Sequence, residues 1–162
     1  MRHTLLTIMA VLLTMSASQS ATAQTRIGEK TILPACEYLN TELDGSLTVR
    51  SYGDGKRHKD AREQARKNAV YQIMFKGLQA KGQTIRPLVN EANAYERHEA
   101  YFGTFFADGG TYSEYATSED EKFTAKKRDH GRTQNIHGAV VRVKRSELKA
   151  RLIRDGILPP EK

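Results

Sequence analysis

The stretch from residue 46 to residue 78 constrains the fold most, because an alternating segment runs through a glycine turn into a helix of regularly spaced alanines. SLTVRSY at 46–52 alternates two sets of side chains, which is typical of a strand with one buried face. A helix is predicted over 61–78, with Asp60 as its N-cap. Its stripe repeats every four residues, at Ala61, Ala65, Ala69 and Ile73. Side chains this small let the helix lie close to a sheet.

Several further elements are expected after this unit. An aromatic face predicts a helix over residues 88–106, and a short strand is expected at 111–117. Residues 121–145 are typical of two strands joined by the turn RDHG. Ser146 is expected to cap a last helix with two leucines one turn apart. The resulting order β, α, α, β, β, β, α predicts an α+β fold, a largely antiparallel sheet with helices packed on one face.

The first 23 residues are predicted to be a cleaved signal peptide. Arg2 opens a short polar region, an apolar run extends from Leu5 to Met15, and ATAQ offers cleavage after Ala23. The apolar run is too short to cross a bilayer, so we expect no transmembrane span in the mature chain. A periplasmic or secreted protein is therefore expected.

The remaining 139 of the 162 residues are enough for one domain with a real core. We expect an N-terminal arm at 24–45 with a helical turn at 36–39, a single α+β domain at 46–158, and a tail at 159–162. Cys36 is the one cysteine, so no intrachain disulfide can form. LPAC at its position resembles a lipobox, but a polar stretch separates it from the apolar run. Burial of this thiol is expected, and pairing between chains is the alternative.

Charge is unevenly distributed along the mature chain, which carries 25 Lys and Arg against 19 Asp and Glu. Residues 90–121 hold eight acids and one base, whereas residues 122–154 hold eleven bases and two acids. A basic surface of this kind suits anionic lipid or polysaccharide. Nucleic acid is not expected as a partner, because Phe123 is the only aromatic residue in the basic segment that could stack on a base.

Two basic segments are candidates for binding an anion or a partner. In GDGKRHKD at 53–60, a glycine-rich loop enters a helix beside Lys56, Arg57 and Lys59, an arrangement that can hold phosphate. The loop lacks both the third glycine of the dinucleotide fingerprint and the GK[ST] of a P-loop, so the pattern favours a solvated turn. The second segment is the tip of the expected hairpin, with Lys126, Lys127, Arg128 and Arg132.

No catalytic residue, metal or cofactor is expected, and the pattern does not indicate an enzyme. The histidines show no ligand spacing, and there is no G-x-S-x-G motif. One alternative remains open, a small periplasmic hydrolase in which His98 would act with Glu91 or Glu96.

LTVRSYGDGKRHKDAREQARKNAVYQIMFKGL at 47–78 and GAVVRVKRSELKARL at 138–152 together resemble the N-terminal domain of flagellar assembly protein T and related short outer-membrane lipoproteins. RPLVNEANAYERHEAYFGTFFADGG at 86–110 is similar to an uncharacterised family of small secreted bacterial proteins. The resemblance implies a non-catalytic envelope or secretion-apparatus accessory domain that binds other envelope components, in particular envelope proteins. It assigns no functional residues.

Overall fold

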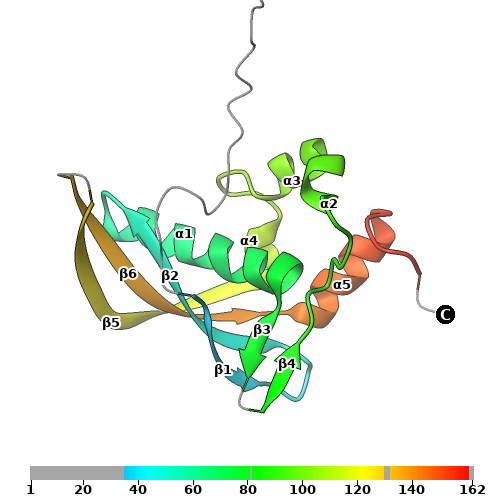
Figure 1. Cartoon of the computed structure of the whole chain (residues 1–162), viewed down its shortest axis with the longest axis horizontal. Helices are drawn as coiled ribbons and strands as arrows, with labels where there is room; N and C mark the ends of the chain where they lie inside the picture. The colour runs from blue at the N-terminus through cyan, green and yellow to red at the C-terminus, as the bar shows by residue number, and fades with distance from the viewer. Residues whose placement is uncertain (1–34, 81, 130–131, 161–162) are drawn as a thin grey trace, which may run out of the picture.

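A computed structural model describes residues 35–80, 82–129 and 132–160, and for residues 119–129 and 132–135 it describes the backbone alone. Predictions that fall on residues 1–34, the signal peptide and its cleavage site among them, lie outside this range. Four antiparallel strands form one sheet in the order β1-β2-β6-β5, with helices packed against it (Figure 1). The predicted α+β class is therefore confirmed. In the described part of the chain, no helix is long and apolar enough to span a membrane.

Strand β2 (Leu47–Gly55) and helix α1 (His58–Tyr71) form the predicted unit, but each is longer at the junction than expected. The strand runs on through both glycines, and the helix begins after Arg57, so the prediction of Asp60 as N-cap is wrong. At this junction the strand packs closely against the helix. A Cβ atom on Gly53 would lie 2.0 Å from the carbonyl oxygen of Ala61, and one on Gly55 would lie 2.6 Å from its amide nitrogen.

The end of this helix differs from the sequence prediction as well. The chain passes into a π-helical turn, η1 (Gln72–Lys76), and stops at Gly77, whose φ is +73°. A hairpin of β3 (Leu78–Ala80) and β4 (Gln83–Ile85) follows, which was not predicted. The amides of Leu88 and Val89 then donate to the carbonyls of Ile73 and Met74. These late helical carbonyls have no partner further along the helix, so the returning segment satisfies them.

The predicted helix over 88–106 is wrong, because the structure has two short helices there, α2 (Ala94–Arg97) and α3 (Glu99–Phe105). Asn93 has a left-handed backbone with φ +57°, and the backbone of His98 is not helical, so no single helix can pass through both. The aromatic face nevertheless packs on the end of α1 and on η1, through Tyr71 and Phe75. Its fully or almost fully buried members are Phe102, Phe105 and Phe106.

The predicted strand at 111–117 is mostly helical, because α4 (Tyr112–Tyr115) places the Tyr112 side chain in the core. Strand β5 (Ala116–Asp129) starts only after that turn and pairs with β6 (Arg132–Val143), which confirms the predicted hairpin. The alternation of β6 is also confirmed. Its buried residues on one face are Ala139, Val141 and Val143.

Helix α5 (Arg145–Arg154) closes the chain, as predicted, and buries Leu148 and Leu152 completely. Its N-cap position is Lys144, so the prediction of Ser146 as the cap is wrong. Gly156, with φ +74°, follows the last turn. A residue in this conformation cannot continue a helix, and glycine adopts it without steric cost.

Strand β1 (Glu37–Thr41) replaces the helical turn expected at 36–39. It pairs antiparallel with β2 and extends the sheet into the segment expected to be an arm. The Cys36 thiol is partly buried and donates to the Ser51 hydroxyl at 3.3 Å, and its burial raises the pKa of the thiol. The expected burial of Cys36 is therefore confirmed in part.

Candidate functional site

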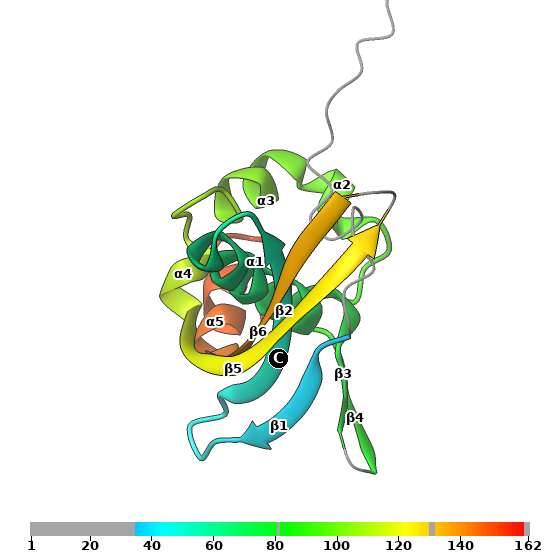
Figure 2. The same ribbon diagram turned by 90° about the vertical axis from the view of Figure 1, so that its left-hand side faces the viewer.

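The pairing register brings the two basic segments to the same end of the sheet. Gly55 of β2 pairs with Asn135 of β6, and Asn135 pairs on its other side with Lys126 of β5. The hairpin continues for three more residue pairs, or about 10 Å at the usual rise of a strand. The end of β5, the start of β6 and the start of α1 lie at one end of the molecule, on the left in Figure 1 and toward the viewer in Figure 2.

We name this region, residues 54–60 with 126–129 and 132, the basic end. It contains seven lysines and arginines against three aspartates, so it carries an excess of four positive charges. The bases of the loop, Lys56, Arg57 and Lys59, are exposed. Those of the hairpin are placed by the backbone, at strand positions 126, 127, 128 and 132.

The connection between β2 and α1 does not form the glycine loop that a bound phosphate would need. Gly53 and Gly55 belong to the strand and pack against α1, which leaves only Lys56 and Arg57 between the two elements. Neither glycine has a positive φ. The basic side chains are therefore presented on a surface, and the backbone of this connection does not wrap around an anion.

A pair of histidines lies at the basic end, and the sequence patterns did not reveal it. The ring of His58, at the first residue of α1, meets the ring of His137 of β6 edge to face, with centroids 4.6 Å apart. Burial, and after it the neighbouring His58, lowers the pKa of His137. These residues are 79 positions apart in the sequence, so only the packing of α1 on the sheet reveals their contact.

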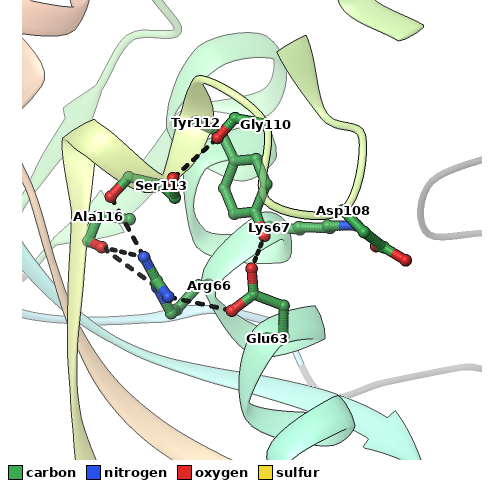
Figure 3. Close-up of polar contacts among 8 residues, drawn as sticks. All are labelled: Glu63, Arg66, Lys67, Asp108, Gly110, Tyr112, Ser113 and Ala116. Carbon is green, nitrogen blue, oxygen red and sulfur yellow. Dashed lines mark hydrogen bonds and ion pairs between the residues drawn. The ribbon is translucent and has the colours of Figure 1, made fainter. Parts of the chain in front are cut away.

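A second polar cluster joins α1 to the segment before β5 (Figure 3). Lys67 is buried to 8% exposure and forms an ion pair with Asp108 at 2.5 Å, which lowers the pKa of that carboxyl. The buried Tyr112 hydroxyl donates to Glu63, which also pairs with Arg66.

Arg66 completes the cluster by reaching across to the backbone beyond α4. It donates to the carbonyl oxygen of Ala116 at 2.8 Å and to that of Ser113 at 3.2 Å (Figure 3). The charged groups of the cluster thus have partners inside the protein. The arrangement holds the segment 108–116 against α1 and is explained by stability alone.

The residues of the alternative hydrolase site do not converge. His98 is partly buried with its ring edge-on to Phe102, while Glu91 forms an ion pair with Arg97. Over the described residues, no hydrogen bond or ion pair joins His98 to Glu91 or to Glu96, and no group of three or more His, Cys, Asp or Glu is placed to hold a metal.

Comparison with known proteins supplies no further guide to the site. No family model matches the chain, and neither curated protein sequences nor solved structures give a significant match.

Proposed function

We propose that this protein is an exported, non-catalytic domain that works by binding, and that its basic end contacts an anionic component of the cell envelope. One observation carries the proposal: the strand register places two basic segments, 70 positions apart in the sequence, at the same end of the sheet. The signal-peptide pattern of residues 1–23 supports export.

The shape of the basic end favours a flat anionic surface as the partner. The hairpin extends beyond β2, and the loop bases beside it are exposed, so charge is presented on a projecting end. A lysine or arginine near an anionic lipid surface contributes about 1 kcal/mol to binding, an attraction that salt screens. Seven such residues against three acids suit a membrane rich in anionic phospholipid.

Co-sedimentation with lipid vesicles tests this proposal. The mature protein is expected to bind vesicles containing phosphatidylglycerol and not vesicles of phosphatidylcholine alone, with binding that weakens as salt increases. Two triple variants each remove three of the seven positive charges of the basic end. They are Lys56→Ser with Arg57→Ser and Lys59→Ser, and Lys126→Ser with Lys127→Ser and Arg128→Ser. Each is expected to weaken binding about a hundredfold, the effect of losing about three charges at the surface.

A matched control removes three exposed bases elsewhere, Arg86→Ser, Arg97→Ser and Arg154→Ser. It lowers the net charge equally but is expected to retain much more of the binding. Equal losses in all three triple variants would show that net charge alone attracts the vesicles. Binding to soluble dextran sulfate but not to vesicles would instead assign the surface to a polysaccharide, and capture of an acidic envelope protein without lipid binding would assign it to a protein.

Export is tested separately by N-terminal sequencing of the protein recovered from the periplasm or medium. The mature chain is expected to begin at Gln24. A chain that keeps residues 1–23 and stays in the cytoplasm would contradict the envelope assignment even if the purified protein bound vesicles.

A further inference from the structure

The histidine pair exists because of the close packing between β2 and α1. His137 is level with Gly53 across the β2–β6 pairing, and Gly53 has no side chain to hold the helix away. The helix approaches so closely that a Cβ at Gly53 would lie 2.0 Å from the Ala61 carbonyl. This approach brings His58, at the start of the helix, onto His137.

Charged residues occur on each element next to the histidine pair. Its own helix carries bases and an acid, and β2 contributes one acid. The β5 backbone pairs with His137 at Thr124, and the neighbouring β5 positions hold acids and bases in the sequence. These residues are Lys59, Asp60 and Arg62 of α1, Asp54 of β2, and Asp120, Glu121, Lys122 and Lys126 of β5, with Lys56 and Arg57 in the connection. His58 therefore belongs to the basic end, and His137 of β6 lies in contact with it.

We propose that the His58–His137 pair makes the basic end bind an anionic lipid surface more tightly in acid, because protonation of the imidazoles adds positive charge where the lipid phosphates lie. This inference rests on the proposed function and adds its regulation. Imidazole is the side chain that ordinarily changes charge near pH 6.5, whereas the lysines and arginines around it stay charged.

Protonating both imidazoles costs free energy when no anion is present. Two imidazolium rings with centroids 4.6 Å apart would repel one another. Positive charge on His58 also opposes the helix dipole at the N-terminus of α1. Burial first, and the neighbouring His58 second, lower the pKa of His137. Because the folded state binds this proton less readily than the unfolded chain, the stability that His137 contributes is present above its usual pKa of 6.5 and is lost as the pH falls below it.

An anionic surface offsets the free-energy cost of protonating the pair. Lipid phosphates beside the imidazolium ions stabilise them, and the two imidazoles therefore take up protons from solution as the protein binds the membrane. Each added charge is expected to strengthen binding about fivefold. Phosphatidylglycerol keeps its phosphodiester charge throughout this range, so a change in the lipid does not explain the effect.

Vesicle co-sedimentation at about pH 7.5 and about pH 5, at constant ionic strength, tests the inference. The parent protein and the double variant His58→Asn with His137→Asn are compared on vesicles containing phosphatidylglycerol. Protonation of carboxylates strengthens binding of both proteins in acid, so the expected result is a rise for the parent at least fivefold larger than that for the double variant. His98→Asn, which changes a partly buried histidine outside the basic end, is expected to behave like the parent.

Two outcomes overturn the inference, and they are distinguishable. An equal rise in the parent and the double variant shows that the pair does not regulate binding, while the proposed function stands. Absence of binding at both pH values removes the proposed function and this inference together. Should the double variant fail to fold, His58→Asn alone serves, because the exposed His58 is not needed for the core; it is expected to lose part of the acid-dependent rise, and a full rise in it overturns the inference.

Discussion

Replacing Gly53 with alanine tests the close contact between β2 and α1 on which the site depends. The new Cβ would lie 2.0 Å from the Ala61 carbonyl oxygen and 2.5 Å from the Ala65 amide nitrogen. Contacts under 3.0 Å are essentially never seen for real Cβ atoms, so helix and strand must separate by about 1 Å. The helix residues that would move are completely buried, among them Ala69 and Val70.

Overpacking of this kind typically costs about 1–3 kcal/mol, and backbone atoms on both sides place Gly53→Ala near the upper end. The lower chain entropy of the unfolded alanine variant offsets roughly 0.5–1 kcal/mol of it. We therefore expect a net loss of about 2 kcal/mol in the free energy of unfolding, measured by urea denaturation with far-ultraviolet circular dichroism. This corresponds to a fall in melting temperature of roughly 6 °C.

Gly103→Ala is the matched control, since it makes the same chemical change inside helix α3 with no atom within 4 Å of the new Cβ. It is expected to stabilise the protein by about 0.5–1 kcal/mol, because alanine favours the helix over glycine. A Gly53→Ala variant as stable as the parent would refute the close-contact argument. So would rescue by Ala61→Gly, because the crowded atom is a backbone oxygen, which that change does not remove.

Three other predictions concern buried or partly buried groups outside the basic end. Tyr112→Phe removes the hydrogen bond to Glu63 and is expected to lower the free energy of unfolding by about 1.5 kcal/mol in urea denaturation. An unchanged free energy would contradict the conclusion that this cluster holds the segment 108–116 against α1. Burial and Asp155 raise the pKa of Tyr101, so stability is expected to fall as the pH rises above about 10, and less steeply in Tyr101→Phe. Because burial raises the pKa of Cys36, iodoacetamide is expected to alkylate it slowly in the native protein and rapidly in urea; equal rates would indicate an accessible thiol.

Short-range patterns predicted those elements whose residues agree locally with their final environment. The alternation at 46–52 and along β6, the alanine spacing of α1 and the paired leucines of α5 all appear where expected. In each case one face of the element is buried against a neighbour, so period and burial coincide. These elements were enough to predict the α+β class.

Other elements could not be predicted, because their local patterns compete with distant contacts. The aromatic residues of 88–106 have helical spacing, yet the left-handed Asn93 and the non-helical His98 break the segment. Its rings pack on the end of α1 and on η1. Strand β1 has little pattern of its own and exists because β2 offers an edge to pair with. Propensity is outweighed in such cases by tertiary packing.

The sequence by itself determined which residues carry charge, and it placed the basic loop and the basic hairpin as separate segments. It also determined that glycines follow the first predicted strand, though the reason inferred for them was a turn. Only the tertiary structure decided that Gly55, Asn135 and Lys126 are level and that His58 meets His137. Strand register and helix approach are set by pairing and packing between residues far apart in the chain, and no local periodicity encodes them.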